Sequence, residues 1–233
     1  MKMNKNTLAS LVLISSGLSL SAHAADSFNI NVTGVISPAA CQANITGGET
    51  IDYGNIPANS LTTDAVTLLP AKQTAFTLTC DAPAKLGFRV IDNRAASKMT
   101  SGEGFIMDSG ISYNYSVLNG LGVDAKGNNI GGWMAELINL TRDAESNNGI
   151  VTSLDDGVTW RKSAVYSDKF GLYSMDSVNR LVSVTDAGGS VPVAFSTLTG
   201  TLSVQTAINP ASTLDLSQPV TLDGSITVEM VYL

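Results

Sequence analysis

The sequence has little of what most enzymes use for catalysis. Its 233 residues include a single His and two Cys, and only 14% are charged and 6% aromatic. Soluble domains typically have about 25% charged residues, so this composition is not typical of a cytoplasmic enzyme. The formal net charge is −7, and an acidic chain without a basic stripe is a poor partner for phosphates. We therefore expect no nucleic-acid binding.

The first 24 residues have the layout of a secretory signal peptide. Lys2 and Lys5 precede an apolar stretch from Leu8 to Leu20, and the small-x-small sequence 22–24 follows it. Cleavage is expected after Ala24. A membrane anchor is disfavoured, because a span needs about 20 apolar residues and this stretch is shorter and rich in Ser.

Cleavage at this position removes His23, which is the only histidine. A chain without His has no Ser-His or Cys-His catalytic pair and no His-based zinc site. The spacing of the carboxylates indicates no acid pair either. The sequence therefore predicts no enzyme, no catalytic residue, no metal site and no cofactor.

Cys41 and Cys80 are the only cysteines. An even number of Cys in an exported chain indicates a disulfide, here with one possible intramolecular pairing. Two buried free thiols or an intermolecular bridge are the alternatives.

Most apolar residues alternate along the chain rather than recurring at helical spacing. Frequent Gly, Asn, Asp and Pro interrupt these stretches, a pattern typical of an all-β sandwich. The predicted strands are 74–80, 86–92, 112–118, 199–208 and 225–232. Residues 133–142 fit a short helix or an irregular strand equally well. We interpret the chain as one domain with an enlarged, loop-rich middle at about 94–189.

Both ends of the mature chain carry an alternating apolar pattern. Near the start, Phe28, Ile30 and Val32 alternate with polar residues, and Gly34 continues the phase before the sequence Pro38-Ala39-Ala40-Cys41. Near the end, the alternating residues are Ile226, Val228, Met230 and the penultimate Tyr232.

In this order, the three features resemble pilus subunits of the chaperone–usher pathway: the N-terminal pattern, the Cys about 40 residues after the first, and the final strand with its penultimate Tyr. The resemblance covers the first 70 or so mature residues and the last 35. It implies an incomplete immunoglobulin-like β-sandwich that a donated strand completes. The chain would then be an exported fimbrial subunit that passes through the periplasm to the cell surface and supports adhesion.

The resemblance also implies roles for the two ends. Residues 25–33 would be a donor-strand extension, with Phe28, Ile30 and Val32 as pocket fillers and Gly34 allowing close backbone approach. The domain would be 34–233, and its final strand would line the acceptor groove that the chaperone also contacts. The implied partners are a periplasmic chaperone, an outer-membrane usher, neighbouring subunits and a host glycan or surface receptor.

The middle of the chain departs from the family pattern. The extension is shorter and the chain longer than in major pilins, which favours a minor or fimbria-like subunit. A self-complete secreted or periplasmic carbohydrate-binding module is the alternative, and an exported glycosidase is a third hypothesis without a nameable acid pair.

A second motif lies in the middle, where residues 153–160 read S-x-D-x-G-x-T-W. This resembles the Asp-box hairpin of sialidase-type propellers, with Asp155, Gly157 and Trp160 at its key positions. A single copy does not make a propeller. We interpret the motif as a tight turn of a hairpin rather than a glycan site, although Trp133 and Trp160 are aromatic platforms that a sugar could use.

Overall fold

The computed structural model describes residues 29–35, 39–100, 102, 104–163, 166–175 and 178–233. The chain divides into two units, Met1–Ser37 and Pro38–Leu233. In the first unit, residues 29–35 have no regular secondary structure. The expected signal peptide and Phe28 lie outside the described residues.

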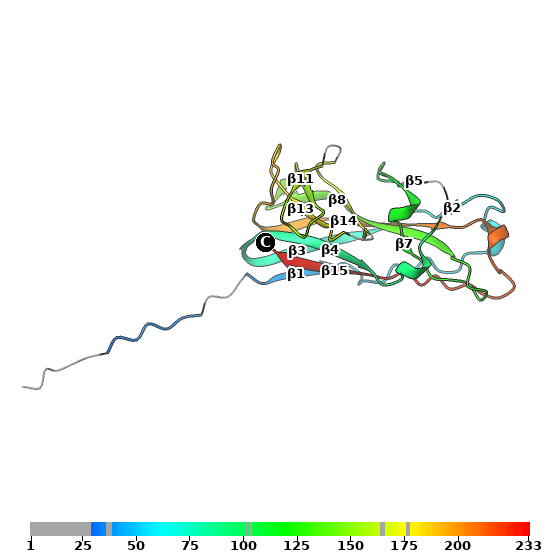
Figure 1. Cartoon of the computed structure of the whole chain (residues 1–233), viewed down its shortest axis with the longest axis horizontal. Helices are drawn as coiled ribbons and strands as arrows, with labels where there is room; N and C mark the ends of the chain where they lie inside the picture. The colour runs from blue at the N-terminus through cyan, green and yellow to red at the C-terminus, as the bar shows by residue number, and fades with distance from the viewer. Residues whose placement is uncertain (1–28, 36–38, 101, 103, 164–165, 176–177) are drawn as a thin grey trace, which may run out of the picture. The chain divides into compact units, whose positions relative to one another are not determined.

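The second unit consists of antiparallel strands in two large sheets and one small one (Figure 1). The first sheet has the order β1 (Cys41–Ile45), β3 (Lys72–Ala84), β14 (Phe195–Ile208), β8 (Gly131–Arg142) and β12 (Phe170–Leu172). The second has the order β11 (Arg161–Lys162), β10 (Ile150–Ser153), β13 (Leu181–Val184), β4 (Leu86–Asp92) and β15 (Ile226–Tyr232). This is an all-β sandwich, consistent with an immunoglobulin-like fold.

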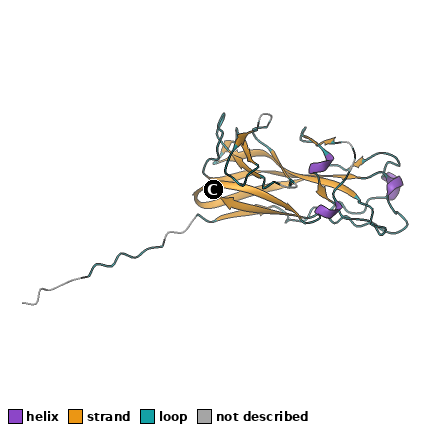
Figure 2. Ribbon diagram, in the orientation of Figure 1, coloured by secondary structure: helices purple, strands orange, loops and turns teal. Residues whose placement is uncertain are grey.

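Short elements complete the second unit. The strand β2 (Thr67–Leu68) pairs with β14, whereas β7 (Asn119–Gly120) and β9 (Glu145–Ser146) pair with β8. The small sheet is β5 (Phe105–Ile106) with β6 (Ser112–Tyr113). Short 3-10 helices lie in the connections between strands (Figure 2), namely η1 (Ala58–Ser60), η2 (Ala95–Ser97), η3 (Tyr115–Val117) and η4 (Ala211–Thr213). Among the described residues, no helix is long and apolar enough to cross a bilayer.

Four of the five predicted strands are present: they correspond to β3, β4, β14 and β15. The prediction of a strand at 112–118 is wrong beyond Tyr113. There the Asn114 side chain accepts a hydrogen bond from the N–H of Ser116 and starts the helix η3. An Asn that bonds two residues ahead favours a turn over continued strand.

Residues 133–142 belong to the strand β8, so the helix alternative is wrong. β8 pairs with β14 on one side and β12 on the other, and both of its faces are largely buried. A strand covered on both faces has a nearly continuous apolar sequence without clear alternation. This explains why the sequence pattern left helix and strand equally open.

The main core lies between the two large sheets and includes Leu78, Leu86, Phe88, Leu137 and Phe195. The middle of the chain builds a second cluster, in which Met134 of β8 packs with Met99, Met107, Ile111, Tyr113 and Leu118. Since Leu137 faces the main core, Met134 and Glu136 face the opposite side of the first sheet. The middle is therefore richer in strands than expected, and it also covers the outer face of β8.

Tyr113 fixes this cover to the sheet. Its hydroxyl donates a hydrogen bond to Oε1 of Glu136 at 2.9 Å, and both side chains are buried. Burial raises the pKa of Glu136. Gly171 of β12 makes room for the tyrosine, because a Cβ there would lie 2.4 Å from its hydroxyl oxygen.

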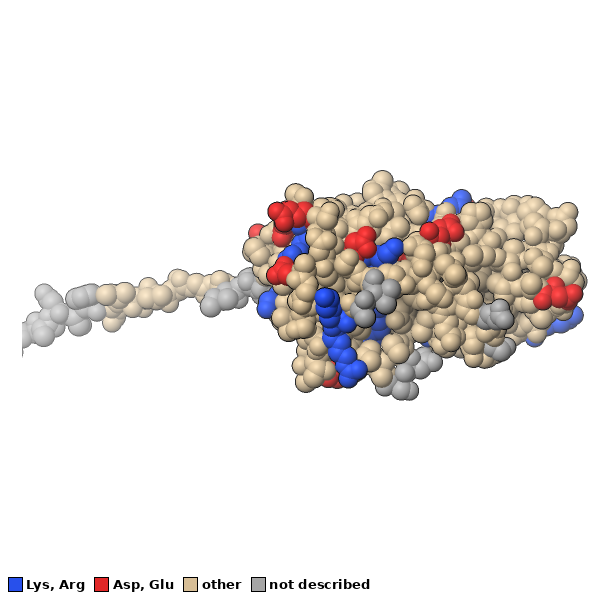
Figure 3. Space-filling view, turned by 90° about the horizontal axis from the view of Figure 1, so that it is seen from above, with Lys and Arg blue, Asp and Glu red and all other residues tan. Residues whose placement is uncertain are grey.

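Charged side chains are sparse on the surface. On the face in Figure 3, charges of both signs are separated by wide uncharged areas, as the 14% charged fraction implies.

The predicted disulfide between Cys41 and Cys80 is confirmed. The two residues lie directly opposite each other in the β1–β3 ladder, with 4.0 Å between their Cα atoms. The bond therefore ties an edge strand of the first sheet to its only described neighbour in that sheet.

We predict that the double variant Cys41→Ala/Cys80→Ala loses about 4 kcal/mol of unfolding free energy. The closed loop spans 39 positions, and removing it restores the loop entropy of the unfolded chain. Urea denaturation measures the change. The matched control is Gln42→Ala/Thr79→Ala, the adjacent opposed pair, which should change stability little. Equal urea midpoints for the two double variants would contradict the prediction.

Candidate functional site: an uncovered edge of the sandwich

One side of the sandwich leaves core-facing side chains uncovered. In the β15–β4 ladder, Val228 lies opposite Val90 and Tyr232 opposite Leu86. Directly opposed residues share a face of the sheet, and these β4 partners are buried in the core. Nevertheless, Val228 is 39% and Tyr232 46% exposed. These two core-facing side chains of β15 are therefore left without a covering strand in the described part of the chain.

The edge strand of the first sheet shows the same feature. In β1, Cys41, Ala43 and Ile45 lie opposite buried residues of β3. Cys41 and Ile45 are only partly buried, and Ala43 is exposed. Two core-facing rows, one on each edge strand, are thus open to solvent.

The two edges lie close together. The hydroxyl of Tyr232 accepts a hydrogen bond of 2.9 Å from the backbone N–H of Cys41, and Figure 1 shows β15 beside β1. Within the described residues, however, β1 pairs with β3 and β15 with β4, but not with each other. We call this region, from 41–45 to 226–232, the open edge. A strand placed there would cover both rows and meet backbone groups on either side.

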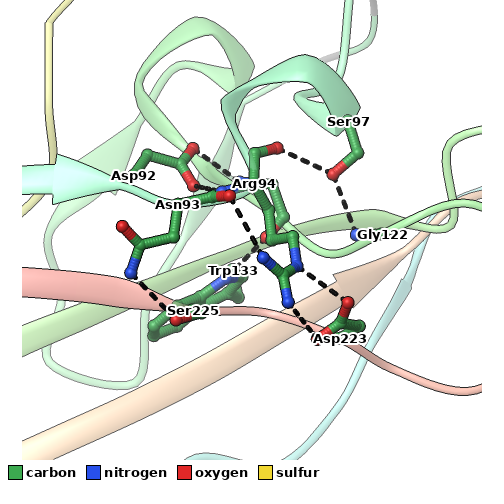
Figure 4. Close-up of polar contacts among 9 residues, drawn as sticks. Asp92, Asn93, Arg94, Ser97, Gly122, Trp133, Asp223 and Ser225 are labelled. Carbon is green, nitrogen blue, oxygen red and sulfur yellow. Dashed lines mark hydrogen bonds and ion pairs between the residues drawn. The ribbon is translucent and has the colours of Figure 1, made fainter.

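A polar network fixes the point at which β15 begins (Figure 4). The guanidinium of Arg94 binds both carboxylate oxygens of Asp223, at 2.7 and 3.0 Å. The side-chain amide of Asn93 donates to the hydroxyl of Ser225 at 3.0 Å. A bidentate guanidinium–carboxylate pair is geometrically specific. It therefore helps to set the register of β15 on β4.

The same network holds the end of β4 against the first sheet. Asp92 accepts the N–H groups of Arg94 and Gly120, at 2.8 and 2.9 Å. Trp133 of β8 donates its indole N–H to the carbonyl of Gly120 at 2.9 Å. Gly224 lies against this indole, and a Cβ there would be 2.5 Å from Nε1. The residue at position 224, two residues before β15 begins, must therefore be small.

A third contact holds β15 from its outward face. Arg89 of β4 pairs with Glu229 of β15 at 3.4 Å, and it also pairs with Asp156 in the turn of the β10–β11 hairpin. Exposed ion pairs of this kind contribute little stability. Here they position the turn at 153–160 relative to β15, because Arg89 binds a carboxylate from each.

That turn has the geometry of a tight hairpin loop held by its own side chains. Asp155 accepts hydrogen bonds from the Ser153 hydroxyl and from both the N–H and the hydroxyl of Thr159. Asp156 and Gly157 have φ of 61° and 87°, as a tight turn requires. The Trp160 indole donates to the carbonyl of Gly157 at 3.0 Å.

The side chains of Ser153, Asp155 and Thr159 bond within the turn. Asp156 bonds outside it, because its N–H donates to the carbonyl of Asn179 and its carboxylate accepts from Arg89. The sequence suggested the rings of Trp133 and Trp160 as platforms for a sugar. The indole N–H of each donates to a backbone carbonyl. The motif therefore positions Asp156 toward Arg89 and supports the hairpin.

Of the residues proposed as a donor strand, the structure describes Ile30, Val32 and Gly34. Ile30 is 77% and Val32 93% exposed, and Gly34 has no other group near its Cβ position. All four proposed groove residues, Ile226, Val228, Met230 and Tyr232, lie on the core-facing side of β15. The sequence analysis missed the core-facing residues of β1, although positions 41, 43 and 45 alternate with polar residues. It also missed the ion pair of Arg94 with Asp223, because no spacing in the sequence indicates that pair.

These features define a class: an all-β sandwich with an uncovered edge and an apolar N-terminal segment. Residues 30–134 match a family described as "Protein of unknown function (DUF1120)". The chain is 27% identical over 255 aligned residues to Protein GltF of Escherichia coli (strain K12), covering 97% of each chain. It is 26% identical over 242 residues to Uncharacterized protein YhcF of the same organism, covering 98% of this chain and all of the other.

We predict that Gly224→Ala destabilises the domain by about 1–3 kcal/mol, because the methyl group must displace the hydrogen-bonded Trp133 indole. Thermal unfolding followed by circular dichroism measures the loss. Gly34→Ala is the matched control, since open space surrounds that position. Equal melting temperatures for the two variants would contradict the steric account.

We also predict an acid-sensitive contribution from Asp155. Hydrogen bonds from the Thr159 hydroxyl and N–H, and from Ser153, lower the pKa of Asp155 to about 2. A lowered pKa in the folded state stabilises the fold above the unfolded value of about 4, and this contribution is lost as the pH falls towards 2.

The measurement is unfolding free energy against pH for wild type and Asp155→Asn. The stability advantage of wild type should shrink between about pH 4 and 2. Asp64→Asn, in an exposed loop, is the control and should leave the wild-type profile unchanged. An advantage that is constant with pH would show that the carboxylate charge does not matter.

Proposed function

We propose that this chain is a structural subunit of a surface fimbria or a fimbria-like polymer, completed by a strand from a neighbouring copy. The observation that carries the proposal is the open edge, where the core-facing residues Val228 and Tyr232 stay exposed. A self-complete sandwich would bury these rows. The alternative of a self-contained carbohydrate-binding module leaves the open edge unexplained.

The N-terminal segment supplies a matching strand. Ile30 and Val32 lie on alternate positions, as an inserted strand requires, and both are exposed. Burying each such side chain is worth about 1.5–3 kcal/mol. Backbone hydrogen bonds along the open edge would add to this. One copy would thus donate its segment to the open edge of the next.

The open edge also supports a requirement for help during export. A long, exposed apolar edge is an aggregation hazard. The proposed partners are therefore a periplasmic chaperone that covers the edge first, an outer-membrane usher and neighbouring subunits. The assembled fibre at the cell surface would support adhesion, with a host glycan or surface receptor as its target.

The test is a melt with a synthetic peptide of residues 27–36. The protein is the chain carrying Ile30→Asp/Val32→Asp, so that its own segment does not compete. Added at about 100 times its Kd, the peptide should stabilise the fold by about 2.7 kcal/mol. The same peptide with Asp at both positions should not stabilise it.

Two further variants locate the binding site. Val228→Asp faces the open edge and should abolish stabilisation by the peptide. Thr227→Asp, on the opposite face of β15, is the matched control and should retain it. A wild-type chain that is monomeric, soluble without a chaperone and unaffected by the peptide would refute the proposal.

A further inference from the structure

A second feature, separate from the open edge, is a cleft in the second sheet. β4 pairs with β15 through seven residue pairs. Its ladder with β13 consists of a single pair, Phe88 opposite Val182. Beyond this point the two strands diverge and leave a cleft of about 250 Å³. It is lined by residues 89–92 of β4 and by Ser174, Met175, Val178, Asn179 and Arg180.

Arg180 is an unusual residue for such a position, since it is only 7% exposed. Its guanidinium lies 3.9 Å from the centre of the Tyr173 ring. Nη1 donates to the carbonyls of Gly171 and Tyr173, each at 3.3 Å. Burial lowers the pKa of this guanidinium.

The part of the chain that the structure describes provides no counter-ion for Arg180. The ion pairs among the described residues involve Arg89, Arg94, Lys126 and Arg142, and none involves Arg180. The hydrogen bonds that Arg180 donates both use Nη1. Within the described residues, Nε and Nη2 thus make none of these hydrogen bonds. A buried cation without an anion is costly, whereas the free edge of a guanidinium matches a carboxylate in a bidentate manner.

The other charged groups of the cleft are already engaged. Arg89 pairs with Asp156 and Glu229. Asp92 accepts hydrogen bonds from two backbone N–H groups. Among the described residues that line the cleft, Arg180 is thus the cationic side chain without an ionic partner.

The walls of the cleft also favour a ligand that carries an apolar group. Ile91, Met175 and Val178 all line the cleft and are partly exposed. Ser174 and Asn179 add two polar side chains. Small-molecule sites commonly combine mostly apolar walls with a few polar groups that fix orientation.

We propose that this cleft binds a small carboxylate that carries an apolar group. The carboxylate pairs with Nε and Nη2 of Arg180, and the apolar group packs against Ile91, Met175 and Val178. The site is independent of the open edge, so it stands or falls separately from strand donation.

The probes are benzoate, benzamide and inorganic phosphate, titrated into the full chain and followed by chemical-shift changes in NMR spectra. We expect benzoate to bind, with benzamide and phosphate each at least tenfold weaker. Equal binding of benzamide would overturn the role of the charge. Preferential binding of phosphate, or no binding of benzoate, would overturn the proposed ligand class.

Variants place the binding site. Val178→Asp puts a negative charge on the cleft wall and should weaken benzoate at least tenfold. Val191→Asp, at an exposed position outside the cleft lining, should leave the affinity unchanged. Arg180→Lys keeps the charge but not the planar fork and should also weaken benzoate at least tenfold. Because Arg180 is buried, its variant counts only if its melting temperature matches wild type, and an unaffected Val178→Asp overturns the location by itself.

Discussion

The structure depends on the ladder between β4 and β15. β4 carries the buried centre of the second sheet, and β15 pairs with it over its whole length. The polar network around Arg94 and Asp223 fixes where β15 begins, so its alternate residues must face the core. With that register set, the absence of a strand between β15 and β1 in the described fold leaves apolar side chains open. Exposure at this edge is thus a consequence of how firmly β15 is held, rather than of a loose terminus.

The enlarged middle serves the first sheet. β8 would present Met134 and Glu136 to solvent if the middle did not cover them, and Tyr113 closes that cover by hydrogen bonding to Glu136. A sandwich normally leaves the outer faces of its sheets to polar residues. Here one outer face is apolar and needs a second layer, which the middle of the chain supplies. The middle therefore has a structural reason that requires no additional domain.

Much of this could be predicted from the sequence, for reasons that can be stated residue by residue. Strands with one buried face, such as β4 and β15, have period-two patterns that mark their positions. The disulfide could be predicted from two Cys in a chain that was expected to be exported, and the turn at Asp155 could be predicted from the spacing of its motif. β8 was ambiguous because both of its faces are buried, and the strand predicted at 112–118 failed because Asn114 bonds locally. The row on β1 and the buried Arg180 depend on which strands become neighbours, and that information is not local.

Some of the few charged side chains of this chain are used in specific ion pairs. Several of the few cations are committed: Arg89 and Arg94 hold β15, and Arg142 pairs with Asp186. Arg180 departs from this pattern, because its anionic partner is missing from the described fold although it is the most deeply buried arginine. A surface charge without a partner is solvated by water, whereas a buried one is not. Arg180 has no anionic partner among the described residues and lies at the wall of a cleft. Both observations support the proposal that this cleft recognises an anion.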